Sequence, residues 1–236
     1  MFKSSTAKRL RSLRESLDIV VLAGLAVILL SGWIFIEVAD EVVEGEAQKW
    51  DRLILQSLSE SDETWDPIGP PWFEDFWRDM TAVGSAGITI LVTTAVAVYF
   101  VLLKKKSVIY LVLGAYAGAG ILALALKALF ERPRPETLTE LARVTSASFP
   151  SGHAMVAMVV YLTLGVLLAS SESRLKFKLY YILLALTVVF LVGISRVYLG
   201  VHYPTDILAG WSLGVVWSVF CWIILYFLRE GPGRNC

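Results

Sequence analysis

The sequence is poor in cysteine and in charge. Only two cysteines occur in 236 residues, Cys221 inside an apolar run and Cys236 at the last position, so the chain can build neither a disulfide framework nor a thiolate metal site. Charged residues make up 18% of the chain, below the roughly 25% that is usual in soluble domains. The 21 Lys and Arg residues balance 21 Asp and Glu residues. Without a basic excess to neutralise phosphates, a nucleic acid partner is not expected.

Hydrophobicity is what the sequence has in excess. Hydrophobic residues make up 56% of the chain, and the mean hydropathy is +0.66. This composition excludes a disordered chain, which combines low hydrophobicity with high net charge. It leaves a membrane protein or a protein with an unusually large core, and the length of the apolar runs distinguishes the two.

The apolar runs are long enough to cross a membrane. Residues 19–36 contain no charge, and a helix of that length, at about 1.5 Å per residue, nearly covers a hydrocarbon core of about 30 Å. The cationic residues before this run also suit a secretory signal peptide, but the run is long for one and no convincing cleavage site follows it. We predict an all-α, polytopic membrane protein, a six-helix bundle forming a single domain over 1–236, with spans at about 19–38, 81–103, 107–130, 153–170, 178–196 and 206–228.

The positions of the positive charges predict the orientation in the membrane. If the N-terminus is cytoplasmic, 13 of the 21 Lys and Arg residues fall on the cytoplasmic side, as the positive-inside rule requires. The loop at 40–79 then lies outside and carries twelve carboxylates. Within it, residues 50–58 are apolar at helical spacing, which predicts an interfacial helix. We place both termini in the cytoplasm and interpret this extracytoplasmic loop as a cover for the bundle in preference to a substrate-binding element.

Ionisable residues cluster at the predicted outer ends of the spans. An ionisable side chain within a membrane costs about 2.5 to 3.5 kcal/mol on insertion scales, so each one suggests a functional site. The chain has only two histidines, and both belong to this group. Its members are Lys127 and Arg134 around the end of the third span, His153 at the start of the fourth, Arg196 at the end of the fifth, and His202 and Asp206 at the start of the sixth.

The first two clusters suit an anion, although each also has a structural interpretation. Lys127 and Arg134 could grip one anion from two directions, or form an interfacial pair whose charged heads reach the water. Ser151 and Gly152 stand at a predicted helix start. They could offer backbone N–H groups to a phosphate, or serve as an ordinary helix cap.

The third cluster combines a base with its orienting group. His202 and Asp206 are four residues apart at a helix start, so the carboxylate can reach a ring nitrogen, fix the tautomer and stabilise an imidazolium. A purely structural Asp–His pair is the alternative. Arg196 offers a bidentate fork suited to phosphate. The structural interpretations weaken because all three clusters converge on one side of the membrane.

The three clusters together resemble a known signature. The pattern K-x(6)-R-P, then P-S-G-H, then S-R-x(5)-H-x(3)-D is similar to that of the type 2 phosphatidic acid phosphatase superfamily, which also contains the vanadium haloperoxidases. In this chain the pattern falls on Lys127, Arg134 and Pro135, on residues 150–153, and on Ser195, Arg196, His202 and Asp206. Arg132 and Pro133 form a second R-P pair two residues earlier, and the family spacing selects Arg134.

The resemblance implies a role for each matching residue. His202 would be the nucleophile that forms a phosphohistidine, Asp206 would orient it, and His153 would protonate the leaving oxygen and then help activate water. The phosphoryl oxygens would be bound by Lys127, Arg134, Ser151, Gly152 and Arg196. Fixed cations then take the place of a metal ion, so neither a metal nor another cofactor is expected.

The resemblance also implies a lipid phosphate substrate in the bilayer. The predicted topology places its hydrolysis at the outer face of the membrane, which we expect to be a bacterial inner membrane. Candidates are undecaprenyl pyrophosphate, phosphatidylglycerol phosphate, phosphatidic acid and lipid A phosphates. A haloperoxidase is disfavoured because those enzymes are typically soluble. A small transporter or channel is disfavoured because the charges gather at one face and do not continue across the bilayer. A lipid phosphotransferase of the same fold is an alternative that the sequence does not separate from a hydrolase.

Overall fold

The computed structural model describes residues 2–61, 65–135 and 147–230. Ser59 and Pro67 form an isolated β-bridge, and helices dominate the rest. Within the described residues the helices are α1 (Phe2–Glu44), α2 (Ala47–Gln56), α3 (Pro71–Val83), α4 (Ala86–Leu102), α5 (Lys106–Phe130), α6 (Gly152–Ser170), α7 (Leu175–Tyr198) and α8 (Pro204–Glu230). The predicted all-α membrane fold is confirmed.

The helices account for the predicted spans, with one break. In the part of the chain that the structure describes, five helices are long and apolar enough to cross a membrane. The apolar run at 81–103 is divided, because α3 ends at Val83, α4 begins at Ala86, and the two are bent by 47°. Ser85 causes the restart: its side chain accepts the Ile88 N–H at 3.4 Å and caps α4. Counted as one bent span, α3 and α4 complete six.

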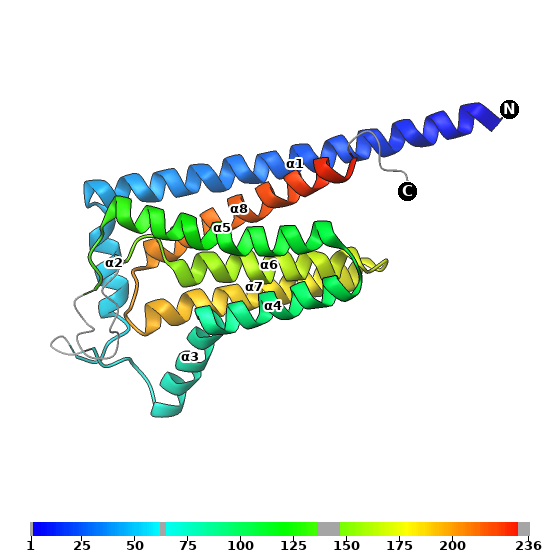
Figure 1. The fold of residues 1–236 in the computed structure, drawn as a ribbon. Helices are drawn as coiled ribbons and strands as arrows, with labels where there is room; N and C mark the ends of the chain where they lie inside the picture. The colour runs from blue at the N-terminus through cyan, green and yellow to red at the C-terminus, as the bar shows by residue number, and fades with distance from the viewer. Residues whose placement is uncertain (1, 62–64, 136–146, 231–236) are drawn as a thin grey trace.

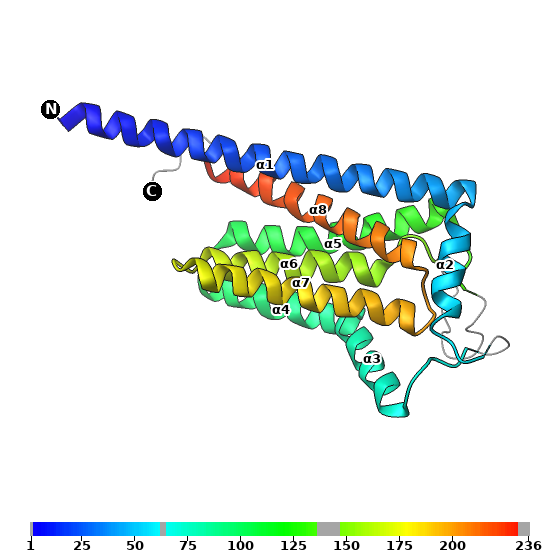
Figure 2. The ribbon, with the colours of Figure 1, turned by 180° about the vertical axis from the view of Figure 1, so that it is seen from behind.

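The bundle is organised around α6. This helix contacts α4, α5, α7 and α8, whereas α1 packs along α8 at one side (Figures 1 and 2). Helix α1 begins and α8 ends at one end of the bundle, and α2 and α3 lie at the opposite end. Large aliphatic side chains such as Leu29, Leu129 and Leu183 are exposed on the outside. Such a surface is suited to lipid tails, which are as apolar as the leucines they contact.

Small residues let the central helices approach closely. Ala115, Ala119 and Ala123 on one face of α5 form a buried cluster with Met155 and Val159 of α6. Short side chains at helix interfaces allow the backbones to pack tightly in a membrane. The three alanines therefore let α5 pack closely against α6. This packing also fixes the position of Lys127, which lies one turn after Ala123 on α5.

The start of α8 is fixed against the start of α6. A Cβ at Gly210 would lie only 2.7 Å from the carbonyl oxygen of Ser151, so this contact requires glycine. The Ser151 N–H donates to the carbonyl oxygen of Asp206 at 3.0 Å. Two motifs that are separated by about fifty residues in the sequence are thereby held side by side.

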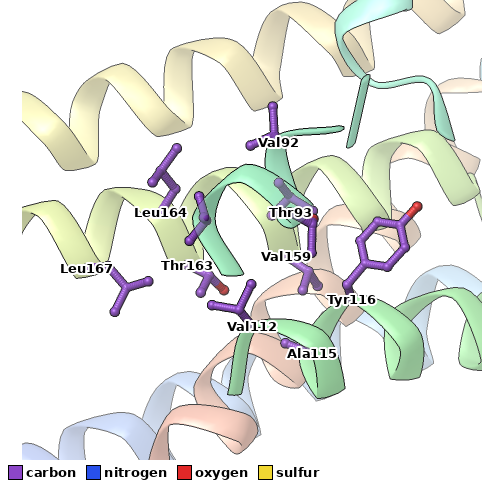
Figure 3. A pocket seen from close by; sticks show the side chains of 11 residues that line it. Val92, Thr93, Val112, Ala115, Tyr116, Val159, Thr163, Leu164 and Leu167 are labelled. Carbon is purple, nitrogen blue, oxygen red and sulfur yellow. The ribbon is translucent and has the colours of Figure 1, made fainter. Parts of the chain in front are cut away.

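A small cavity of about 20 Å³ lies between α4, α5 and α6 (Figure 3). Aliphatic side chains form most of its wall, with Thr93, Tyr116 and Thr163 as the polar contributions. It has room for about one water molecule. None of the predicted site residues lines it, so we interpret it as a packing feature of the bundle.

Candidate active site

The predicted site residues lie at the end of the bundle that holds α2. Each occupies a helix end or the loop beside it, so the bundle presents them without placing charges at its centre. Lys127 is in the last turn of α5 and Arg134 in the following loop; Ser151 caps α6, which begins with Gly152 and His153; Arg196 is in the last turn of α7, His202 follows α7, and Asp206 is in the first turn of α8.

His202 is held between a carboxylate and an arginine. Its Nδ1 lies 3.2 Å from Asp206 Oδ2, and the Tyr203 N–H donates to the same oxygen at 3.0 Å. On the other side of the ring, Arg134 Nη1 lies 3.4 Å from His202 Nε2. Because an ionised carboxylate faces Nδ1 and an arginine donor faces Nε2, we assign the ring proton to Nδ1 and the lone pair to Nε2. This is the tautomer that a nucleophilic Nε2 requires.

Burial keeps the imidazole of His202 neutral. The side chain is buried, and desolvation lowers the pKa of His202 to about 3, although the hydrogen bond to Asp206 acts in the opposite direction. A neutral imidazole has a lone pair with which to attack, whereas an imidazolium has none. The environment therefore favours the reactive form at neutral pH.

Three cations converge on this region. Arg134 contacts the imidazole, Arg196 Nη1 donates to Thr81 Oγ1 at 2.9 Å, and Lys127 Nζ donates to the Ala147 carbonyl. The Nε of Arg196 is buried without a hydrogen-bond partner among the described residues. Neither Lys127 nor Arg196 forms an ion pair with a carboxylate that the structure describes. Arg196 is buried and Lys127 is partly buried, and cations shielded from water without a carboxylate partner are suited to bind an anion.

The N-terminus of α6 faces the same group of cations. Ser151 Oγ accepts a backbone N–H of the first turn at 3.4 Å. Beside Gly152 there is space: the nearest atom to an added Cβ would be Lys127 Cε at 3.8 Å. His153 interacts electrostatically with His202 and with all three cations. The first N–H groups of a helix and the positive end of its dipole favour a phosphate at this position.

A cavity of about 780 Å³ lies beside Arg134. Gln48 and Arg52 of α2 contribute polar groups to its wall, and Tyr203 lines it next to His202. The sequence predicts a covering role for the loop at 40–79, and that role stays a prediction. Helix α2 within the loop also lines this cavity, together with Arg134 and Tyr203.

Two charged residues outside the three sequence motifs contact the candidate site. Arg132, which the family spacing passed over, forms ion pairs with Asp51 of α2 and with Asp206, each at 2.7 Å. The sequence feature that could have identified Asp51 is a carboxylate on the buried face of an amphipathic helix. It stands four residues from both Ala47 and Leu55, the other buried residues of α2.

Named proteins are similar to this chain in sequence. The profile of the PAP2 superfamily matches residues 107–230, more than half of the chain. Phosphatidylglycerophosphatase B of Bacillus subtilis (strain 168) is 33% identical over 165 residues, which are 70% of this chain and 77% of that protein. Undecaprenyl-diphosphatase of Sulfolobus acidocaldarius is 41% identical over 70 residues, 30% of each protein.

Solved structures share the fold. The crystal structure of a transmembrane PAP2-type phosphatidylglycerolphosphate phosphatase from Bacillus subtilis has a TM-score of 0.72 at 27% identity, and the match covers 89% of this chain and 98% of that one. Aquifex aeolicus LpxE has a TM-score of 0.54 at 23% identity, over 75% of this chain and 94% of that one, and supports the fold alone. The resemblance predicted from the three motifs is confirmed: the chain belongs to the PAP2 superfamily and is a membrane-integrated lipid phosphatase.

Proposed function

We propose that the protein hydrolyses a phosphate or diphosphate group of a membrane lipid through a phosphohistidine on His202, without a metal ion, at the outer face of a bacterial inner membrane. One observation carries the proposal. His202 Nε2 lies 3.4 Å from Arg134 Nη1, while Asp206 engages the other ring nitrogen. A neutral imidazole nitrogen among cations is arranged to attack a phosphorus atom whose oxygens those cations bind.

In the first step, His202 Nε2 forms a bond to phosphorus, and the bond from phosphorus to the leaving oxygen breaks. The negative charge of the bound phosphate favours the protonated form of His153, which gives its proton to that oxygen. The Nδ1 proton stays on the ring, and Asp206 balances the positive charge of the phosphorylated imidazole.

In the second step, water attacks phosphorus and the nitrogen–phosphorus bond breaks. His153 takes the proton of the attacking water, which restores its starting state, and inorganic phosphate leaves. In both steps, charge on the equatorial oxygens is neutralised by Lys127, Arg134 and Arg196, with the N-terminus of α6 beside them. These groups supply the charge that Mg²⁺ supplies in other phosphoryl-transfer enzymes.

The position of the candidate site at the ends of the membrane spans supports a lipid as the substrate. A phosphate at headgroup depth can reach the outer ends of the spans while its hydrocarbon tails stay among the helices, and the cavity of about 780 Å³ beside Arg134 leaves room for a headgroup. Two relatives are named as a phosphatidylglycerophosphatase and an undecaprenyl-diphosphatase. Phosphatidylglycerol phosphate and undecaprenyl pyrophosphate are therefore the first substrates to test, followed by phosphatidic acid and lipid A phosphates.

The detergent-purified protein is expected to release inorganic phosphate from at least one of these lipids in excess EDTA, because its cations are fixed side chains. The assay compares mono- and diphosphorylated lipids, with glycerol phosphate as a water-soluble control. Vanadate should inhibit the release without producing halide oxidation. Activity that EDTA removes and Mg²⁺ restores would contradict the metal-free mechanism, and release from none of the lipids would contradict the function.

Thiol labelling tests the proposed orientation. Lys49 on α2 and Lys105 between α4 and α5 are both exposed, at opposite ends of the bundle. In a protein without Cys221 and Cys236, a membrane-impermeant maleimide should label Lys49→Cys in intact cells and Lys105→Cys only after permeabilisation. This result is expected because the positive-inside rule places α2 outside. The reverse pattern would place the site in the cytoplasm.

A further inference from the structure

We propose that Arg132 is a positioning residue for the nucleophile: with Asp51 of α2, it holds the Asp206 carboxylate in the orientation that His202 requires. The inference rests on the proposed function, because it assigns Arg132 a part in the same reaction. It also makes α2, a helix of the outer loop, part of the support of the active site.

Arg132 spreads its guanidinium over two carboxylates. Its Nη1 donates to Asp206 Oδ1 at 2.7 Å and to Thr205 Oγ1 at 2.9 Å. Its Nη2 donates to Asp51 Oδ2 at 2.7 Å. The ring of Tyr203 lies under the guanidinium, 4.3 Å from Cζ to the ring centroid, which adds a cation–π contact. Both terminal nitrogens and one face of the arginine are thus engaged.

Asp206 is shared between Arg132 and the nucleophile. Arg132 occupies Oδ1, and His202 Nδ1 lies beside Oδ2. With Oδ1 held by a charge-assisted hydrogen bond, the carboxylate cannot turn away from the imidazole without losing that bond. Arg132 therefore acts on His202 through Asp206 and not by contact with the reacting nitrogen.

Asp51 anchors the other end of the arginine. The Thr205 N–H donates to Asp51 Oδ1 at 3.1 Å, and the Thr205 hydroxyl donates to Oδ2 at 2.6 Å. The exposed fractions of Asp51, Arg132 and Asp206 are 1%, 8% and 0%. Charges buried to this extent need partners of opposite sign. A helix that only covered the bundle would be served better by apolar contacts, so the buried carboxylate on α2 indicates a role toward the site.

The test removes the arginine while leaving the net charge of the buried cluster unchanged. Arg132→Met alone would leave Asp51 buried without its cation, so the decisive protein is the double variant Arg132→Met/Asp51→Asn. Arg132→Lys keeps the charge but replaces the fork by a single ammonium. The matched control is Arg78→Met, which removes an exposed arginine from its ion pair with Glu74 on α3.

In the double variant, we expect kcat to fall about 10- to 100-fold, the scale found for groups that orient metal-ligating side chains. KM should change by less than about threefold, because the substrate contacts stay in place. Arg132→Lys should recover part of the loss, and Arg78→Met should match the unaltered protein.

The pH profile separates positioning from a purely structural role. The acid limb of the kcat/KM profile should move up by about one pH unit in the double variant, because a buried carboxylate without its cation is protonated more readily. The other ionisable groups around His202 are the same in both proteins: Lys127 on α5, Arg134 in the loop after it, His153 on α6, Arg196 on α7, and Tyr203.

A second measurement needs no substrate. The chain has two histidines, so ¹⁵N-histidine spectra of the His153→Gln protein report on His202 alone. We expect the Nδ1–H tautomer, and a mixture of tautomers once Arg132 and Asp51 are also replaced.

An unchanged kcat, pH profile and tautomer in the folded double variant would overturn the inference, and so would a raised KM with an unchanged kcat. No phosphate release by the unaltered protein would instead overturn the proposed function. In that case the tautomer of His202 would still test whether Arg132 positions Asp206.

Discussion

Replacing His202 with glutamine is expected to reduce lipid phosphate hydrolysis at least about 10⁴-fold, because glutamine has no nitrogen lone pair with which to attack phosphorus. Any residual rate would come from the cations and the N-terminus of α6 acting on a water molecule. The measurement is inorganic phosphate released from the lipid that the unaltered protein hydrolyses fastest. The loss should appear in kcat, because the cations that bind the phosphoryl oxygens stay in place.

Trapping the intermediate distinguishes a lost nucleophile from a lost fold. With a lipid labelled in the transferred phosphate, rapid quenching should yield an acid-labile, alkali-stable phosphoprotein from the unaltered chain and none from His202→Gln. The variant should elute as the unaltered protein does in detergent, since the buried ion pair of Arg132 and Asp206 is unchanged. A variant that still traps phosphate, or that keeps full activity, would show that another residue is the nucleophile.

Asp206→Asn is expected to lower kcat about 10³- to 10⁴-fold, a loss comparable to that of replacing the orienting aspartate of a Ser-His-Asp triad. The asparagine amide can present its NH₂ group to the imidazole, which favours the tautomer with the proton on Nε2 and removes the nucleophilic lone pair. The substitution also takes a charge from the ion pair with Arg132, at 2.7 Å. Both effects disturb the orientation of His202. The expected loss of kcat therefore exceeds the loss expected from replacing Arg132.

The control for this prediction is the same substitution at Asp75→Asn, an exposed position on α3, which should leave the rate unchanged. Steady-state kinetics measure the effect, and the ¹⁵N-histidine spectrum measures the tautomer. If Asp206→Asn kept both the rate and the Nδ1–H tautomer, the orienting role of Asp206 would be wrong.

The grouping of the candidate site residues at one end of the bundle could be predicted from the sequence, because these residues stand beside strong local signals. His202 and Asp206 are four residues apart at the start of α8, and the structure places their side chains 3.2 Å apart. Ser151 precedes an apolar run and caps α6. The restart of the helix at Ser85 escaped prediction, because an average of hydropathy over 81–103 does not register a single capping side chain.

The sequence by itself determined the all-helical membrane fold and the residues that meet at one end of it, because the length of an apolar run and spacings of three or four residues are local properties. Only the tertiary structure decided that Arg132 bridges Asp51 and Asp206, which stand 81 and 74 positions away. Helix α2 folds across the end of the bundle (Figure 1), and its buried carboxylate must then find a cation. Which cation it finds depends on how distant helices pack, and no local spacing in the chain encodes that choice.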